Sequence, residues 1–257
     1  MNTIHGLIWL RFISLKKNKN ILLIALFPFV FAFLYSNFMI KDNFAEKASI
    51  VSMCLTMGFS TSSLNILTST IAEEKEKYNL KTLLLSGVSG LEYIFSTLII
   101  PVVLGVITIL ILPQIAQVDF GASYFQYLLI SFLTLIVHIL FGLVIAMVSE
   151  TQTKAQMNSM PVLLLSSFLP MLSSFNEQIR KICDLSHVGA HNKFFTKLIA
   201  GENTSLVWSD MLVLGVWIAM LYALTIILYK KTKKGNSTIN FTNLFRFKKD
   251  GDIACKL

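Results

Sequence analysis

The chain has 257 residues, of which 54% are hydrophobic and only 14% are charged, and its formal net charge is +8. An ordinary soluble domain has about 25% charged residues, so this composition, with a mean hydropathy of +0.68, excludes a normal solvated surface. The apolar residues are gathered into long runs with few charges, which predict an all-α integral membrane protein and exclude a soluble enzyme.

Six runs are long enough to cross a bilayer as helices. A hydrocarbon core about 30 Å thick needs about 20 helical residues. We expect spans at about residues 21–40, 48–72, 93–115, 122–149, 156–176 and 207–229. The first run is longer than the apolar part of a signal peptide, which predicts that it is retained as a span. The fifth contains Pro161 and Pro170, so we expect an irregular helix there.

The distribution of Lys and Arg predicts that both termini lie in the cytoplasm. With that orientation, sixteen of the 22 basic residues fall in inner segments. Residues 230–257 then form a basic cytoplasmic tail. Its first lysines, at residues 230–234, are more typical of an anchor to lipid headgroups than of a nucleic-acid site. We therefore expect contact with membrane lipid and no nucleic-acid partner.

The inner stretch between the second and third spans predicts a short helix over residues 73–87. Its acidic residues come first, where a helix favours negative charge. Leu80, Leu83 and Leu84 follow at helical spacing and give one apolar face, and Gly87 is a plausible stop. An apolar face at the inner membrane surface needs lipid or a protein partner. The segment is thus either an ordinary interfacial helix or a docking element for a cytoplasmic subunit.

This stretch resembles the segment after the second span of ABC-2-type transporter permeases, whose pattern is roughly E-[RK]-E-x-G-T-L-x-x-L-L-x-[ST]-P-V-[ST]. Tyr78-Asn79 stands where the family has Gly-Thr, and Gly87 where it has Pro. The layout also matches over residues 1–257, taken as a single transmembrane domain. The positions that match the pattern are Glu74, Lys75, Glu76, Leu80, Leu83, Leu84, Ser86, Val88 and Ser89.

The resemblance implies a permease subunit that forms a dimer, which we expect to be a homodimer, and that pairs with a separate ABC ATPase subunit. It also implies that residues 3–17 form an interfacial elbow helix, whose Arg11, Lys16 and Lys17 we expect to reach lipid headgroups. The coupling helix that docks on the ATPase would contain Glu74, Lys75, Glu76, Leu80, Leu83, Leu84 and Ser86.

The sequence predicts no catalytic, cofactor-binding or metal-binding residue. No G-x-x-x-x-G-K-[ST] pattern occurs, so we expect ATP and Mg²⁺ to bind the partner ATPase, which hydrolyses the ATP. His187 and His191 have the spacing of a two-ligand metal face but lack the glutamate of an H-E-x-x-H pattern, and we expect both on a solvated surface. Cys54, Cys183 and Cys255 are expected to be unpaired thiols.

Two residues form a possible intramembrane polar site. His138 lies well inside the fourth span, where it either packs against a neighbouring helix or handles a proton or substrate. Gly142 and Ala146 continue its face and favour close packing. Asn65 belongs to a polar stretch of the second span that faces either a transport cavity or another helix.

The outer stretch at residues 177–205 predicts one or two amphipathic or re-entrant helices before the last span. Together these features predict the permease subunit of an ATP-driven ABC exporter that moves an amphipathic or hydrophobic substrate, such as a peptide, antibiotic or lipid-like molecule, outward. The alternatives are a membrane assembly or sensing protein with a non-ATPase cytoplasmic partner, and an intramembrane enzyme. The enzyme would need paired acids or a Ser/His constellation, and the spans offer only His138.

Overall fold

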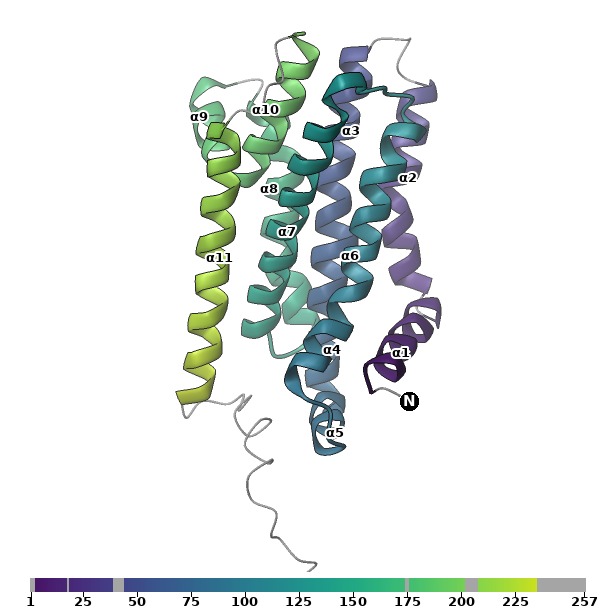
Figure 1. Ribbon diagram of the computed structural model, residues 1–257, viewed down its shortest axis with the longest axis vertical. Helices are drawn as coiled ribbons and strands as arrows, with labels where there is room; N and C mark the ends of the chain where they lie inside the picture. Colours follow the sequence, from purple (N-terminus) through teal and green to yellow (C-terminus); the bar gives the residue numbers. More distant parts are fainter. Residues whose placement is uncertain (1–2, 18, 39–43, 174–175, 202–207, 235–257) are drawn as a thin grey trace, which may run out of the picture.

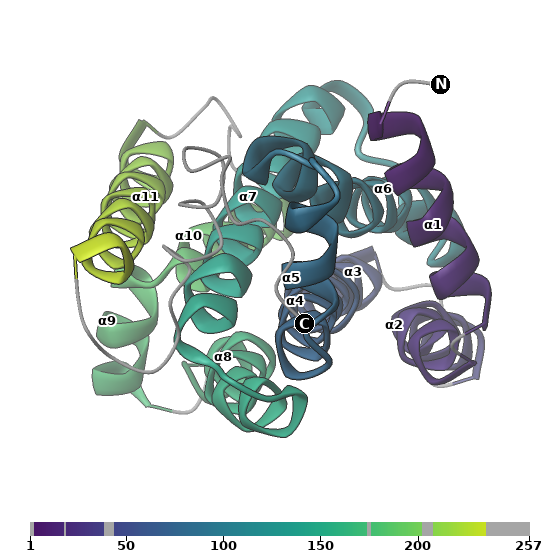
Figure 2. The same ribbon diagram turned by 90° about the horizontal axis from the view of Figure 1, so that it is seen from below.

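The computed structural model describes residues 3–17, 19–38, 44–173, 176–201 and 208–234, and all regular structure in these residues is helical (Figure 1). Most of the helices lie side by side along the long axis, and α1 lies across one end of the bundle (Figure 2). The elements are α1 (Thr3–Lys17), α2 (Lys19–Phe38), α3 (Phe44–Gly58), the π-helix η1 (Phe59–Asn65), α4 (Ile66–Glu76), α5 (Asn79–Leu85), α6 (Gly90–Ile115), the 3₁₀ turn η2 (Gly121–Ser123), α7 (Tyr124–Val148), α8 (Gln152–Ser173), α9 (Glu177–Leu185), α10 (His187–Ile199) and α11 (Trp208–Lys234).

Four stretches of the described residues are long and apolar enough to cross a membrane: Phe44–Glu76, Glu92–Ile115, Gly121–Val148 and Ser209–Leu228. They correspond to the second, third, fourth and sixth predicted spans, and the chain is a multi-pass membrane protein. A shorter apolar helix covers Leu23–Phe38. α8 is not among the four, because its first two turns are polar. The predicted count of six is thus not reached by this measure, although α2 and α8 belong to the same bundle.

The prediction that the fifth span is irregular was wrong. α8 is one continuous α-helix from Gln152 to Ser173, with Pro161 and Pro170 inside it. A proline removes one backbone donor, but the other peptide groups of an apolar segment have no water to bind and keep their helical partners. α2 and α6 contain prolines inside unbroken helices in the same way.

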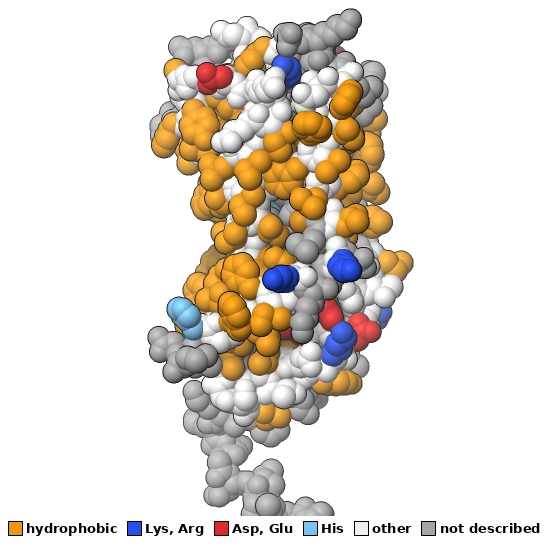
Figure 3. Space-filling view, turned by 90° about the vertical axis from the view of Figure 1, so that its right-hand side faces the viewer, with side chains coloured by type: hydrophobic (Ala, Val, Ile, Leu, Met, Phe, Trp, Pro, Cys, Tyr) orange, Lys and Arg blue, Asp and Glu red, His pale blue; other side chains and the backbone are white. Residues whose placement is uncertain are grey.

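The outer surface of the bundle carries the apolar side chains that a lipid environment requires. On the face shown in Figure 3, hydrophobic side chains cover the middle, and charged side chains lie above and below them. α2 contributes Leu23, Phe27, Phe33 and Phe38 to the exposed apolar residues. Such a continuous apolar surface is rare on a soluble monomer and typical of contact with lipid or another protein.

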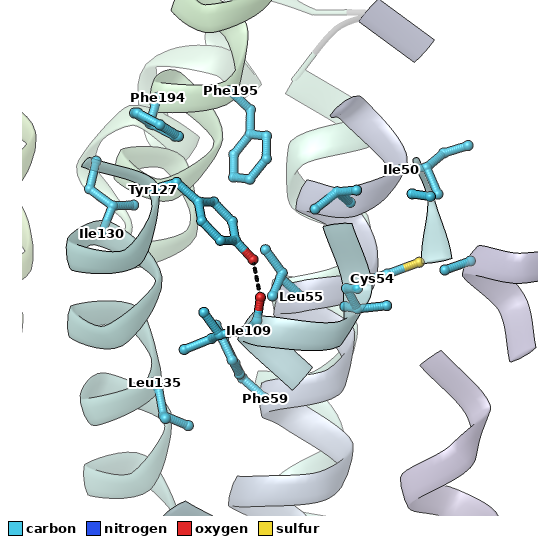
Figure 4. Close-up of a cluster of buried hydrophobic side chains, with 14 of the residues drawn as sticks. Ile50, Cys54, Leu55, Phe59, Ile109, Tyr127, Ile130, Leu135, Phe194 and Phe195 are labelled. Carbon is cyan, nitrogen blue, oxygen red and sulfur yellow. Dashed lines mark hydrogen bonds between the residues drawn. The ribbon is translucent and has the colours of Figure 1, made fainter. Parts of the chain in front are cut away.

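The largest buried cluster includes aromatic side chains of α7 and α10, which pack beside Ile109 of α6 (Figure 4). The Tyr127 hydroxyl donates a hydrogen bond of 2.6 Å to the Ile109 carbonyl, and the Phe195 ring meets the Tyr127 ring edge-on. Close helix contact is seen at Gly142, where an added Cβ would lie 3.3 Å from the Leu64 carbonyl oxygen. The close helix packing predicted at Gly142 is confirmed.

The outer stretch forms two helices, α9 and α10, at the end of the bundle opposite α5 (Figure 1). We call residues 177–199 the α9–α10 hairpin. α9 is amphipathic, as predicted, with Cys183 buried and Glu177, Gln178, Arg180 and Lys181 exposed. The predicted tail at 230–257 lies outside the described residues apart from the end of α11.

Candidate functional site

The segment that resembles the coupling motif is divided between two helices. α4 continues to Glu76, so the acidic residues form the end of the second span. The prediction that they begin a separate helix was wrong. Lys77 and Tyr78 then make the turn into α5, and Tyr78 has a φ of 58°. This left-handed conformation favours glycine, the residue of the family pattern at that position. The chain therefore keeps the turn with a tyrosine in place of glycine.

α5 has one buried and one exposed side. Leu80 is buried with Leu7 of α1 and Tyr93 of α6, and Leu83 packs against this cluster. The predicted apolar face therefore covers α1 and α6 within the chain. The exposed side includes Tyr78, Asn79, Thr82, Leu85 and Ser86. Leu84 belongs to α5, but its side chain lies outside the described residues.

Glu74 is buried and joins α4 to two other helices. Its carboxylate forms a two-point ion pair with the Arg11 guanidinium of α1, with one N–O distance of 3.1 Å. The Tyr93 hydroxyl donates to the same carboxylate at 2.6 Å, and Arg11 donates to the Thr97 hydroxyl at 2.9 Å. Arg11 is only 5% exposed, so the prediction that it reaches lipid headgroups was wrong. Nothing in the local sequence distinguishes Arg11 from its basic neighbours.

The next two residues bind the loop between α7 and α8. The Lys75 ammonium donates to the carbonyls of Ala146 at 2.5 Å and Ser149 at 3.2 Å, at the end of α7. The Glu76 carboxylate accepts the backbone N–H of Gln152, the first residue of α8, at 2.9 Å. Each charge matches the helix end that it binds, because helix C-termini are negative and N-termini positive.

The sequence model of the ABC-2 family transporter proteins matches residues 34–227 of this chain. The chain belongs to the ABC-2 transporter family. No curated protein and no solved structure matches it in the corresponding comparisons. ABC-2 permeases are the membrane components of ABC transporters and are not themselves catalytic, and membership implies partnership with an ABC ATPase subunit.

In this ABC-2 chain the polar stretch of the second span is buried and contains the π-helix η1. Most of its hydroxyls bond within the bundle: Ser63 donates to the Pro101 carbonyl at 3.0 Å, and Thr68 lies 3.2 Å from the Ser159 hydroxyl. The Ser62 hydroxyl and the Asn65 side-chain oxygen have no partner in the described part of the chain. The hydroxyls of this stretch therefore bond mainly within the bundle, and the described residues show no hydrogen bond between Asn65 and His138.

His138 lies instead beside the α9–α10 hairpin. Its ring centroid is 5.0 Å from that of His187, and His191 approaches the Ser52 hydroxyl at 3.5 Å. All three rings are buried, so the predicted solvated surface for His187 and His191 was wrong. The i, i+4 spacing places both on one face of α10, and that face points into the bundle.

The histidines of this cluster have few polar partners. His138 Nδ1 lies 2.9 Å from the Thr134 carbonyl and, because a carbonyl only accepts, must carry the proton. His138 Nε2, both ring nitrogens of His187 and Nε2 of His191 have no partner among the described residues. Burial lowers the pKa of His187 well below its usual value and that of His191 to about 3. The described residues contain no group of three or more side chains suited to hold a metal ion.

Three contacts hold the α9–α10 hairpin in place. Gly189 lets the two helices approach closely, since an added Cβ would lie 1.8 Å from the Cys183 carbonyl oxygen. The Trp217 indole of α11 donates to the Leu185 carbonyl at 2.9 Å. Lys197 of α10 pairs with Asp210 of α11 at 3.2 Å. The hairpin of this ABC-2 chain is therefore a packed part of the bundle.

Proposed function

We propose that this chain is the membrane-spanning permease subunit of an ATP-driven ABC exporter, and that the exposed side of α5 is the docking surface for the ATPase subunit. Family membership, which implies an ATPase partner, supports the pairing. The proposal that α5 is the docking surface is supported by the exposure of two large side chains at a polar end of the molecule. Tyr78 is 73% exposed and Leu85 is 60% exposed. The ATPase binds ATP and Mg²⁺ and performs the hydrolysis.

In this proposal α2 and α8 also cross the membrane, which gives six spans. The excess of Lys and Arg in the segments at the α5 end supports a cytoplasmic location for that end and for both termini. The α9–α10 hairpin then lies at the outer end. Two copies of the chain form the permease, and the exposed Leu164, Leu165 and Phe168 of α8 offer an apolar surface for the second copy.

The transported substrate is amphipathic or hydrophobic, of the class of peptides, antibiotics or lipid-like molecules, and moves outward. The exposed apolar side chains along the bundle support this class, because they suit an apolar molecule as well as lipid. Closure of the ATPase dimer on ATP displaces α5 and opens a path between the two copies. The hairpin stands at the exit of that path.

Co-purification tests the docking surface. A tagged chain is isolated from native membranes in mild detergent, and the proteins that accompany it are identified by mass spectrometry. We expect an ABC ATPase with the unaltered chain and about tenfold less of it with Leu85→Asp, because a charge at the centre of an interface costs about 1.4 kcal/mol or more. Thr153→Asp, on the exposed start of α8 at the same end of the bundle, is the matched control and retains the ATPase.

Equal recovery of the ATPase with Leu85→Asp and Thr153→Asp would show that α5 is not its docking site. Recovery of a different cytoplasmic protein that depends on Leu85, without any ATPase, would instead support the assembly or sensing alternative.

A further inference from the structure

Three consecutive residues at the end of α4 bind three different parts of the bundle. Glu74 binds α1 and α6, Lys75 binds the end of α7, and Glu76 binds the start of α8. We propose that Glu74, Lys75 and Glu76 are positioning residues that carry a displacement of α5 into these four helices, and that they are not contacts for the ATPase. This inference rests on the proposed function, because the ATPase supplies the displacement.

The Glu74 connection is stiff because it is buried and fully engaged. The carboxylate receives the Arg11 guanidinium at both oxygens and the Tyr93 hydroxyl at one of them. Charge-assisted bonds of this kind are short and directional, and burial strengthens them. Glu74 is only 9% exposed, which leaves it no surface for a partner protein. A movement of the end of α4 therefore moves α1 and the start of α6.

The Lys75 connection uses carbonyls that the helix itself leaves free. The last four carbonyls of an α-helix have no partner inside the helix. The Lys75 ammonium reaches the carbonyls of Ala146, Met147 and Ser149, all at the end of α7. It thus replaces the missing helix bonds and attaches α7 to α4.

The Glu76 connection is the corresponding contact at a helix start. The carboxylate accepts the Gln152 backbone N–H, one of the free donors at the beginning of α8. The Gln152 side chain in turn donates to the Ser69 hydroxyl of α4 at 3.2 Å. Lys75 and Glu76 therefore hold the α7–α8 loop from both of its ends.

The segment that connects these contacts to the docking surface on α5 is short. Only Lys77 and Tyr78 separate Glu76 from α5, and Leu80 of α5 is itself packed against α1 and α6. A displacement of α5 is therefore transmitted to the end of α4, because the two connecting residues are too few to absorb it. Glu73 differs from the three residues that follow it. Its carboxylate pairs at 2.5 Å with Lys77, one turn along the same segment, and not with another helix.

The test measures whether a nucleotide-driven movement crosses these contacts. Spin labels are placed at Lys16 of α1 and Gln156 of α8, both exposed, in a chain whose three cysteines are replaced by alanine. The chain is purified with its ATPase and reconstituted in lipid nanodiscs. The distance between the labels is then measured by double electron–electron resonance, without nucleotide and after trapping with ATP and vanadate.

We expect trapping to shift the label distance in the otherwise unaltered chain and in Glu73→Ala. In Glu76→Ala the equilibrium constant for the shifted state should fall about tenfold, a usual size for coupling between two sites. The amounts of bound ATPase and of trapped nucleotide should stay the same. Glu76→Gln keeps an oxygen to accept the Gln152 N–H and should restore the shift. If Glu76 only stabilised the fold, Glu76→Ala would reduce nucleotide trapping and the label movement together.

A full shift in Glu76→Ala would overturn the inference and leave the proposed function intact. Loss of ATPase binding in Glu76→Ala, with binding retained in Glu73→Ala, would also overturn it, because Glu76 would then be a partner contact. Absence of any ATPase from the unaltered chain would refute the proposed function itself, and this inference with it.

Discussion

Arg11 and Glu74 lie 63 residues apart in the sequence and form a buried, two-point ion pair at one end of the bundle. The pair connects the helix that lies across this end to the second membrane span. Both side chains are nearly inaccessible, at 5% and 11% exposure. A buried charge is tolerated only when its partner and its further hydrogen bonds are present. The attachment of α1 to the bundle thus depends on a small number of polar atoms.

Arg11→Ala is expected to destabilise the chain by about 3–5 kcal/mol, because it leaves the Glu74 carboxylate buried without its counter-charge. The free energy of unfolding in mixed detergent micelles, titrated with a denaturing detergent, measures the effect. Lys154→Ala is the control: it breaks the exposed pair with Glu150 and should cost about 1 kcal/mol or less.

Removal of both buried charges separates this explanation from simple loss of packing. The double variant Arg11→Met with Glu74→Leu should recover most of the stability lost in Arg11→Ala, since no unpaired charge remains. Equal stability of Arg11→Ala and Lys154→Ala would contradict the account of a structural ion pair.

Gly189→Ala is expected to disrupt the α9–α10 hairpin. The added Cβ would lie 1.8 Å from the Cys183 carbonyl oxygen, and a backbone atom cannot move aside without separating the two helices. We expect a loss of about 1–3 kcal/mol, as for overpacking elsewhere, and faster hydrogen exchange confined to the hairpin. Gly215→Ala in α11 is the matched control, because nothing lies within 4 Å of its added Cβ, and it should not destabilise the chain.

The sequence was sufficient to predict the helices because the length of an apolar run and its spacing are local properties. Four of the predicted apolar stretches coincide for this reason with long apolar helices of the described residues, around α4, α6, α7 and α11. The continuity of α8 could not be predicted from Pro161 and Pro170, because whether a proline breaks a helix depends on the alternatives open to the neighbouring peptide groups.

The hydrogen-bond and ion-pair partners of the polar residues could not be predicted from the sequence. Arg11, Lys16 and Lys17 look alike along the chain, and only the packing of α1 against α4 and α6 buries Arg11. We expected the α10 histidines on a solvated surface, yet His187 and His191 point into the bundle because α10 folds back against α3 and α7. The resemblance of residues 74–89 to an ABC-2 segment was visible in the sequence, but the contacts of this segment within the chain appear only in three dimensions.

Trp217→Phe is expected to loosen the hairpin while preserving most of its packing. The substitution removes the indole N–H that donates to the Leu185 carbonyl, a bond worth about 1 kcal/mol. Cys183, buried two residues earlier in the same helix, reports the opening through its rate of reaction with a thiol reagent. We expect this rate to rise about fivefold. Trp9→Phe, at a 69% exposed position of α1, is the matched control, and an equal rise in both variants would contradict the prediction.

Acid is expected to destabilise the hairpin end of the bundle. Burial holds the pKa of His187 well below the unfolded value of about 6.5 and that of His191 at about 3, so the unfolded chain binds more protons below pH 6.5. The stability associated with the neutral rings is fully present above about pH 6.5. It is lost as the pH falls below this value, by up to about 1.4 kcal/mol per pH unit for each histidine that remains neutral in the folded chain.

Unfolding free energies measured between pH 7.5 and pH 4.5 test this dependence. His191→Gln removes one of the two titrating rings of α10 and should make the loss of stability with acid shallower. His5→Gln, at an exposed position of α1, is the matched control for the substitution itself. If His191→Gln and His5→Gln lose stability with the same slope as the unaltered chain, burial of the α10 histidines is not the source of the acid sensitivity.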